Sequence, residues 1–402
     1  MPVKVGSPKA KYLSKKEQIK LESLSPLSPA TPSSSAKDAE EFHGRYEMIK
    51  ALAEGSFGTV WSARDRERVR RREQVVKVAV KIVDHGGEDT ELVQNETEMH
   101  EKLFADGGGS PLLVKLYDVL FEDLRALLVL ELFEGGELRE KIDAAPQGRL
   151  PESVAAPIVR QLASALSFMH SKHVAHLDVK PENILVDSRP RIKLLDYGSA
   201  CAMDQPNAPK GRRGLCQDIG GTDRYMAPER LALPSPSTWF GGAAADIYSL
   251  GAVLLHTLLG GAAADALAAK AAAMAKSEEA NAKARANTKE RPSDTNRQVA
   301  VVMGKAAKSA AAAAGTAAVQ AEATRLEAEV RLSPSAMDLL LASTRVEPDE
   351  RPAAAELLTQ EWLLTPTERT AKESKRCNDA AGSPGKISVA GLKEALPVAE
   401  IS

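Results

Sequence analysis

The chain has 402 residues, 43% of them hydrophobic and 27% charged, which suits about two or three globular domains. Its formal net charge of −2 excludes a strongly basic chain, so we expect neither nucleic acid nor a membrane as a partner. Three cysteines without a C-x-x-C pair favour a reduced protein, and there is neither a secretory signal nor a run of eighteen apolar residues. We therefore expect a cytoplasmic or nuclear protein.

Both ends of the chain have the composition of tails. Ser, Pro, Lys and Ala dominate from Ser23 to Lys37, and such a segment has too few large apolar residues to bury a core. We expect a disordered tail over residues 1–44 and a second tail over residues 364–402. The folded part is predicted to span residues 45–363.

The first folded segment combines strand candidates with a turn of small residues. Met48–Leu52 is predicted to be a strand, and residues 53–60 (Ala-Glu-Gly-Ser-Phe-Gly-Thr-Val) are predicted to form the turn. Glycine allows the backbone to approach a bound phosphate without a Cβ in the way, although an ordinary hairpin turn explains the pattern equally well. The charged run Arg64–Glu73 is predicted to be a solvated hairpin loop, or alternatively a docking patch for an acidic partner.

Further strands and helices follow in the first half of the chain. Val75–Val83 is predicted to be a strand, and its period of two places Ala79 and Lys81 on one face. Residues 88–104 have helical character, with Glu96 near the apolar face. Two more strands at 112–119 and 124–132 and an amphipathic helix at 151–171 complete this part.

Four polar residues lie in a short span after that helix: Asp178, Lys180, Asn183 and Asp196. Two short apolar runs lie between Asn183 and Asp196, a pattern that predicts a loop, a hairpin and a turn. Such a hairpin can present two carboxylates, an amide and an ammonium group to one point. Phosphoryl transfer to a hydroxyl needs this combination, because a base, metal ligands and a cation must surround the moving group.

The last part of the folded region contains an abrupt change of composition. Asp246 begins an apolar helix that is predicted to be buried. Alanine then dominates from residue 261 to 330 and large apolar residues are scarce, so we expect an exposed insertion, partly helical and partly disordered. Globular sequence returns over Pro334–Leu364.

The motifs occur in the order found in eukaryotic protein kinases, which the chain resembles over residues 46–363. The matching sequences are the Gly-rich turn at 53–60, Val78-Ala79-Val80-Lys81, His176-Leu177-Asp178, Asp196-Tyr197-Gly198 and Ala227-Pro228-Glu229. The resemblance implies an α+β, bilobal fold. A small β-rich N-lobe with one helix would span residues 45–131, and a mainly helical C-lobe would span residues 132–363.

The resemblance also implies catalytic roles for the polar cluster. Asp178 would accept or orient the proton of a substrate hydroxyl, and Lys180 would steady the γ-phosphoryl group of ATP. Asn183 and Asp196 would hold Mg²⁺. Lys180 followed by Pro181-Glu182-Asn183 is similar to the sequence of Ser/Thr kinases rather than tyrosine kinases.

The resemblance implies a larger set of ATP-binding residues: Ala53, Gly55, Gly58, Val60, Ala79, Lys81, Glu96, Leu130, Glu131, Phe133, Glu137 and Leu185. Ala53 occupies the place of the first glycine of the Gly-rich loop. Glu96, with Glu98 as the alternative, would pair with Lys81. Leu130 would be the gatekeeper, and Glu131 and Phe133 would contact adenine through their backbones.

Two further residues are implied to have structural roles. Asp246 would bond to the backbone of the catalytic loop. Arg351 would pair with Glu229 and so connect the activation segment to the C-lobe.

One departure from the family concerns regulation. Leu177 replaces the arginine that normally contacts an activation-loop phosphate, and residues 200–221 contain no Ser, Thr or Tyr. We therefore predict activity that does not depend on phosphorylation of this segment. The His-Leu-Asp form is similar to the calmodulin-dependent and death-associated kinase branch.

Two alternatives remain open from the sequence. Ala53, His100, Tyr197 and the insertion are compatible with a pseudokinase that binds nucleotide or partners without efficient catalysis. His100 occupies a place that belongs to the hydrophobic regulatory spine in the family. Cys201 and Cys216 are predicted to be ordinary reduced cysteines, with redox sensitivity as the alternative. Protein substrates are the expected partners, and the sequence does not define the oligomeric state.

Overall fold

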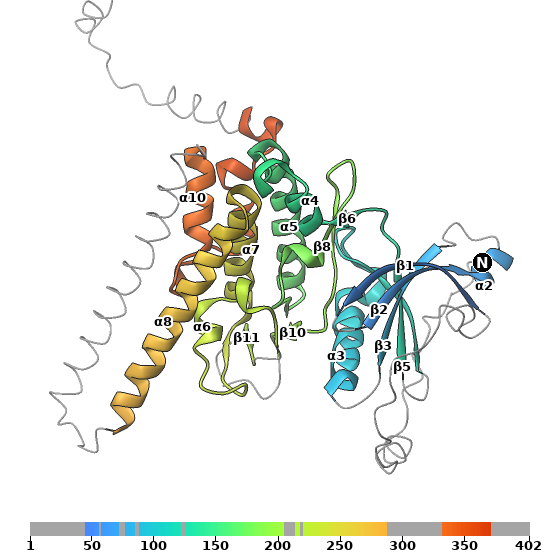
Figure 1. Cartoon of the computed structure of the whole chain (residues 1–402), viewed down its shortest axis with the longest axis horizontal. Coiled ribbons are helices and arrows are strands. Elements are labelled where there is room, and N and C mark those ends of the chain that lie inside the picture. Colours follow the sequence, from blue (N-terminus) through green and yellow to red (C-terminus); the bar gives the residue numbers. More distant parts are fainter. Residues whose placement is uncertain are drawn as a thin grey trace, which may run out of the picture.

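A computed structural model describes residues 45–55, 58–71, 77–84, 88–121, 125–204, 214–217, 220–287 and 332–370. The predicted tail at 1–44 and most of the one at 364–402 lie outside the described residues. The described chain forms two lobes, with a β-sheet, one long helix and one short helix at one end and the other helices at the opposite end (Figure 1). The predicted bilobal α+β fold is therefore confirmed.

The N-lobe is built on an antiparallel five-stranded sheet in the order β1-β2-β3-β5-β4. Its elements are β1 (Tyr46–Gly55), β2 (Gly58–Asp65), α2 (Arg66–Arg70), β3 (Lys77–Asp84), α3 (Glu88–Leu103), a 3-10 turn at Ala105–Gly107, β4 (Leu116–Phe121) and β5 (Arg125–Glu131). Alternate residues of β3 and β5 fill two small clusters on opposite faces. One cluster includes Val93 of α3, so the helix covers one face of the sheet.

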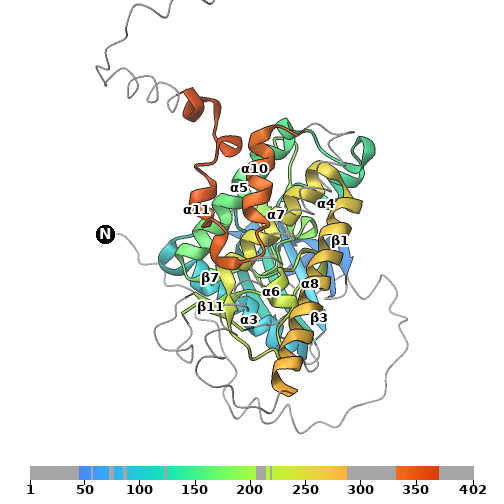
Figure 2. The same cartoon turned by 90° about the vertical axis from the view of Figure 1, so that its left-hand side faces the viewer.

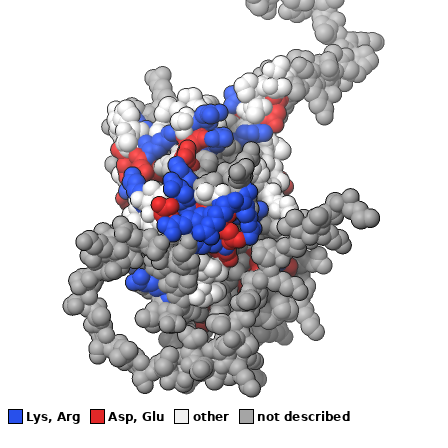
Figure 3. All heavy atoms as spheres, turned by 90° about the vertical axis from the view of Figure 1, so that its right-hand side faces the viewer, with Lys and Arg blue, Asp and Glu red and all other residues white. Residues whose placement is uncertain are grey.

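The charged run after β2 does not form the loop that the sequence predicted. Residues Arg66–Arg70 form the helix α2, because Asp65 accepts hydrogen bonds from the backbone N–H groups of Glu67 and Arg68 at the first turn. Lys and Arg side chains gather over this end of the N-lobe (Figure 3). Many of them have acidic neighbours, as when Arg45 contacts both Asp65 and Asp118 at 3.0 Å.

The C-lobe begins after β5 with short strands around a long helix. Its first elements are β6 (Gly136–Glu137), α4 (Leu138–Asp143), a 3-10 turn at Pro146–Gly148, α5 (Glu152–Ser171), β7 (Val174–Ala175), a 3-10 turn at Pro181–Asn183, β8 (Ile184–Val186), β9 (Ile192–Leu194) and β10 (Cys201–Ala202). The strands β6, β8 and β9 form one antiparallel sheet, which carries the predicted hairpin.

The remaining C-lobe elements are β11 (Leu215–Cys216), a 3-10 turn η4 (Asp223–Tyr225), α6 (Pro228–Leu231), β12 (Phe240–Gly241), α7 (Gly242–Leu259), α8 (Gly261–Asn287), α10 (Pro334–Ser343), a 3-10 turn at Pro348–Glu350, α11 (Ala354–Leu357) and a 3-10 turn at Glu361–Leu363. One large apolar core connects α5 and α7 with the helices around them (Figure 2). Ile158, Leu162 and Leu166 of α5 are fully buried there, as the amphipathic pattern predicted.

The helix α7 is the most apolar long helix among the described residues. By length and hydropathy it is the one described helix that could cross a membrane, but 89% of that stretch is buried inside the protein. It packs against α5 and α10. Its apolar character is thus explained by its position in the core, and the prediction of a buried helix starting at Asp246 is confirmed apart from its four-residue earlier start.

The first part of the alanine-rich segment is not the exposed insertion that the sequence predicted. It forms α8, which lies along α7 and α6, and its far end projects past the lobe (Figure 1). Ala264, Leu267, Ala271 and Ala275 are buried at spacings of three and four residues. Small side chains allow close contact between helices, so this narrow stripe is buried although Leu267 is its one large apolar residue. Residues 288–331 lie outside the described part.

The pairing of Arg351 with Glu229 is confirmed. The Arg351 guanidinium donates to both carboxylate oxygens of Glu229, at 2.6 and 2.8 Å, and also to the Ala244 carbonyl of α7 at 2.9 Å. A bidentate pair of this kind fixes orientation as well as distance. It attaches α6, at the end of the activation segment, to the core helix α7.

Cys201 and Cys216 form a disulfide, so the prediction of reduced cysteines is wrong for this pair. β10 pairs with β7, and β11 pairs with β12, so two small sheets bring the sulfurs together across 15 residues of sequence. That proximity depends on tertiary structure, and the sequence spacing gave no sign of it. The disulfide joins the beginning of the activation segment to Cys216, twelve residues before α6.

Replacing both Cys201 and Cys216 with alanine is expected to lower the free energy of unfolding by about 3 kcal/mol, because the disulfide restricts the unfolded chain. Denaturant unfolding without reductant measures this difference, and Cys377→Ala is the control. Peptide mapping of the unreduced protein should recover the two cysteines in one linked fragment. Alkylation of both cysteines after unfolding without reductant would contradict the pairing.

Candidate active site

An ion-pair network between the lobes forms the centre of the site. Lys81 on β3 donates to Glu96 on α3 at 2.9 Å and to Asp196, in the turn after β9, at 3.1 Å. Glu96 is therefore the partner of Lys81, and the alternative Glu98 is excluded. The two bonds join the sheet, the N-lobe helix and the C-lobe turn through one ammonium group.

The burial of this network determines its electrostatics. Burial lowers the pKa of Lys81, but attraction to Glu96 and Asp196 outweighs it, so the pKa lies above its usual value. Burial raises the pKa of Asp196, but the charge and hydrogen bond of Lys81 bring it below its usual value. Lys81 is thus held as a cation and Asp196 as an anion, in the charge states that phosphate and metal binding require.

The strand register places the predicted nucleotide residues around Lys81. Val60 on β2 is paired with Lys81, and the gatekeeper Leu130 on β5 is paired with Ala79. Gly58 has φ +111°, and a Cβ there would lie 1.8 Å from the Ile82 carbonyl oxygen, so only glycine fits this turn. Ala53 pairs with Val60, and Gly55 with Gly58, across the same hairpin.

In the segment between the lobes, some backbone groups of Glu131 and Phe133 already have hydrogen-bond partners, so fewer of them can contact an adenine. The Glu131 N–H donates to the Lys115 carbonyl at 2.8 Å, so Glu131 could contact an adenine only through its own carbonyl. Its carboxylate pairs with Lys193 at 2.7 Å. The Phe133 carbonyl accepts from the Gly135 N–H at 3.0 Å, which turns the chain toward β6.

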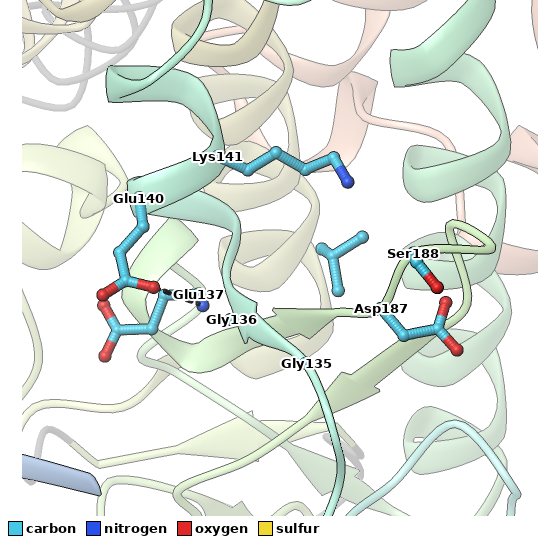
Figure 4. A pocket seen from close by; sticks show the side chains of 8 residues that line it. Gly135, Gly136, Glu137, Glu140, Lys141, Asp187 and Ser188 are labelled. Carbon is cyan, nitrogen blue, oxygen red and sulfur yellow. Dashed lines mark hydrogen bonds between the residues drawn. The ribbon is translucent and has the colours of Figure 1, made fainter.

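A cavity of about 360 Å³ lies where this segment meets the C-lobe. Glu137 and Glu140 lie on one side, Asp187 and Ser188 on the other, and Lys141 extends from α4 above them (Figure 4). Glu137 is the predicted nucleotide residue that lines it, and Leu185 is paired with Glu137 in the adjoining sheet. The cavity therefore adjoins the predicted ribose end of the site rather than the catalytic residues.

The catalytic loop is held by a buried carboxylate. Asp246 of α7 accepts from the backbone N–H groups of His176 and Leu177, both at 2.8 Å, and from the His170 ring at 2.8 Å. Burial raises the pKa of Asp246, but the hydrogen bond and charge of His170 outweigh it, so the pKa is below its usual value. The predicted role of Asp246 is confirmed.

Asp178 and Lys180 meet at the end of this loop, together with a residue that the sequence analysis did not single out. Lys180 lies 2.7 Å from Asp178 and donates to the Thr222 hydroxyl at 2.8 Å. The same hydroxyl donates to the Asp178 carboxylate at 2.8 Å. Thr222 belongs to the Gly-Thr motif that precedes the Ala-Pro-Glu motif, and that motif was the available signal.

Asn183 and Asp196 provide the oxygen ligands that the predicted metal would need. The Asn183 side-chain nitrogen donates to the Asp178 carbonyl at 2.8 Å and to its carboxylate at 3.1 Å, which orients the amide. Its oxygen is then the amide atom suited to a cation. Mg²⁺ is usually held by one or two carboxylates together with substrate phosphates, so this donor set fits it. The described residues contain no cluster of three or more His, Cys, Asp or Glu side chains suited to a metal.

Three aromatic rings pack between the two lobes, tilted or edge-on to one another. Tyr197 lies 4.5 Å from His100 and 5.8 Å from His176, measured between ring centroids. The Tyr197 hydroxyl lies 3.0 Å from the Leu194 carbonyl and 3.3 Å from that of Val114. Burial, helped by the charge of Lys81, lowers the pKa of His100 to about 3. Its Nδ1 has no hydrogen-bond partner among the described residues.

His100→Leu is expected to make the protein more stable and less sensitive to acid. Below pH 6.5 the unfolded chain binds a proton at His100 and the folded protein does not, so stability falls as the pH drops. The wild type should lose about 1 kcal/mol more than the variant between pH 7.5 and pH 5.5. Denaturant unfolding at both pH values measures this, and equal losses would contradict it.

The geometry is that of a protein kinase, and the comparison with known families agrees. The profile of the protein kinase domain family matches residues 46–363. This match covers more than half of the chain, so the chain belongs to the protein kinase family.

The curated relatives include plant kinases. The chain is 33% identical over 245 residues to CBL-interacting serine/threonine-protein kinase 7 of Arabidopsis thaliana, covering 60% of this chain and 52% of that protein. It is 36% identical over 222 residues to CBL-interacting protein kinase 24 of Oryza sativa subsp. japonica, covering 54% and 44%. The chain thus spans about half the length of the curated relatives that it matches.

Proposed function

We propose that this protein is an ATP-dependent protein kinase that phosphorylates serine and threonine hydroxyls of protein substrates. The observation that carries the proposal is the contact of Asp178, Lys180 and Thr222 within 2.8 Å. It places a base and a cation on either side of a hydroxyl group. The Lys-Pro-Glu-Asn sequence and the serine/threonine kinase among the relatives support the choice of acceptor.

The residues support a mechanism in which the protein acts mainly by positioning the reacting groups and stabilising their charges. Asp178 accepts or orients the proton of the incoming hydroxyl, a contribution of about 10²–10⁴ in rate. Lys180 offsets charge on the transferred phosphoryl group. Lys81, held by Glu96, contacts the phosphates that remain on the nucleotide. The Thr222 hydroxyl already bridges Asp178 and Lys180, so it keeps both side chains in place before a substrate arrives.

Mg²⁺ is the proposed metal, held by Asn183 and Asp196. When bound, it would offset the negative charge of the phosphates. Asp196 reaches the site from the turn after β9 with φ +67°, a conformation that non-glycine residues rarely adopt. Its bond to Lys81 helps to maintain that conformation.

No specific observation favours the pseudokinase alternative. The side chains that a pseudokinase often lacks are present: Lys81 bonds to Asp196 at 3.1 Å, and Asn183 bonds to Asp178 at 3.1 Å. His100 and Tyr197, which suggested the alternative, pack against each other inside the protein with tilted rings. Protein substrates are the proposed partners. A cytoplasmic or nuclear location, with neither nucleic acid nor a membrane as partner, also remains a proposal.

Asp178→Asn is expected to lower phosphate transfer at least about 100-fold, since it removes the base and keeps the shape of the side chain. Transfer of label from ATP to a generic basic protein with Mg²⁺ measures this, and acid hydrolysis of the product should release phosphoserine and phosphothreonine. Asp143→Asn, an exposed carboxylate on α4, is the matched control and should keep full activity. Equal transfer by wild type and Asp178→Asn would refute the proposed function.

Activity is further proposed not to depend on phosphorylation between Asp196 and Gly221. Leu177 is 2% exposed and carries no charge that could bind a phosphate. Phosphatase treatment of the purified protein should therefore leave the rate of phosphate transfer unchanged within about a factor of two. A large loss of activity that mass spectrometry traces to a phosphate in that segment would contradict this.

A further inference from the structure

The peptide units around Leu177 are held in an unfavourable conformation directly before Asp178. Leu177 has φ +62°, a conformation that a residue with a Cβ seldom adopts. Such a conformation persists only where the surroundings enforce it. The Leu177 N–H donates to Asp246 at 2.8 Å, and its carbonyl accepts from the Arg230 guanidinium at 2.6 Å.

Arg230 is buried and reaches a second segment. It lies on α6, is 3% exposed, and donates from its other terminal nitrogen to the carbonyl of Gly220 in the activation segment. Its guanidinium also lies 5.3 Å from the centre of the Phe240 ring. A planar guanidinium can hold two acceptors in one fixed geometry, which a lysine cannot do.

The neighbouring backbone is packed closely against this link. A Cβ on Gly221 would lie 2.8 Å from the Leu177 carbonyl oxygen and 3.3 Å from both terminal nitrogens of Arg230. Gly221 has φ +140° and directly precedes Thr222, which contacts Asp178. The activation segment therefore meets the catalytic loop at Arg230, which bonds to Gly220, two residues before Thr222.

Arg230 itself is held by the core. The preceding residue, Glu229, is paired with Arg351, and Arg351 also bonds to the Ala244 carbonyl of α7. Asp246, which holds the Leu177 N–H, is on the same helix. Both ends of Leu177 are thus fixed to α7, the N–H directly and the carbonyl through Arg351, Glu229 and Arg230.

We propose that Arg230 is a positioning residue for phosphate transfer, which joins the catalytic loop to the activation segment in place of an arginine–phosphate contact. This inference rests on the proposed kinase activity. Leu177 cannot form a charged contact with a phosphate, and residues 200–221 offer no hydroxyl to modify. Arg230 of α6 supplies the link instead. Its acceptors are two backbone carbonyls, so the link forms without phosphorylation of any residue.

The test compares Arg230→Met and Arg230→Lys with the wild type. Methionine keeps most of the length and removes both hydrogen bonds, and the bonds of a charged donor are worth roughly a 10- to 100-fold change. Arg230→Met should raise the KM for a protein substrate and lower kcat by about that factor, while the KM for ATP stays the same. Arg230→Lys can bond to one carbonyl and should recover part of the loss.

Arg160→Met is the matched control. Arg160 also donates to a backbone carbonyl, that of Leu363 at 2.6 Å, but at the far side of α5. It should keep the kinetic constants of the wild type. Two results would show that the inference is wrong. One is a lower kcat of Arg230→Met with both KM values unchanged, which is what a partly unfolded preparation would give. The other is agreement between Arg230→Met and Arg160→Met in every kinetic constant.

Hydrogen exchange gives a readout that does not depend on activity. Arg230→Met should speed the exchange of backbone amides in the segment from Gly220 to Met226, and leave those of α5 unchanged. Exchange that increases equally in both, or in neither, overturns the inference. Asp178-dependent transfer by the wild type tests the proposed function separately, so an inactive wild type with normal exchange differences would refute the kinase activity and leave the structural link in place.

Discussion

The fully buried carboxylate of Asp246 is the group on which the site geometry depends. Its two oxygens accept from two consecutive backbone N–H groups of the catalytic loop and from one histidine ring. A buried charge without such partners would cost several kcal/mol, so the carboxylate and the loop can adopt only a mutually satisfied arrangement. Since Asp246 lies on the most buried helix, the position of the loop is set by the core and not by the substrate.

A second constraint couples the two lobes. Lys81 can neutralise two carboxylates only if the N-lobe helix and the C-lobe turn approach it together. Glu96 is buried and the side chains of Lys81 and Asp196 are only 15% and 22% exposed, so separation of the lobes would leave at least one of these charged groups without a partner. The packed rings of His100, Tyr197 and His176 add a contact across the same boundary. The closed arrangement of the described lobes therefore follows from charge pairing and ring packing together.

The parts that the sequence predicted are those whose chemistry allows few alternatives. Lys81 and Asp178 are carried by short motifs, and strand periodicity was sufficient to orient Lys81. Helix spacing favoured Glu96 but left Glu98 open, and the contact with Lys81 decided between them. The failures concern contacts between distant segments. The mainly alanine stripe of α8 gives little hydrophobic signal in the sequence, and it becomes buried only because α7 and α6 pack against it. The charged residues after β2 form α2 because Asp65 caps the first turn of that helix. Thr222 and Arg230 act through contacts 44 and 53 residues away, which no local pattern reports.

The burial of the Cys201–Cys216 disulfide determines how long it would persist in the presence of a reductant. Cys201 is 3% exposed and Cys216 is fully buried beside Gly242, where a Cβ would lie 2.7 Å from the sulfur. Thiol–disulfide exchange requires a thiolate to reach a sulfur atom, so a dissolved reductant must wait for the segment to open. The bond would then be protected kinetically, and a chain that acquired it during folding would carry it into a reducing compartment. The lifetime of the disulfide in a reductant would therefore report how often the activation segment opens.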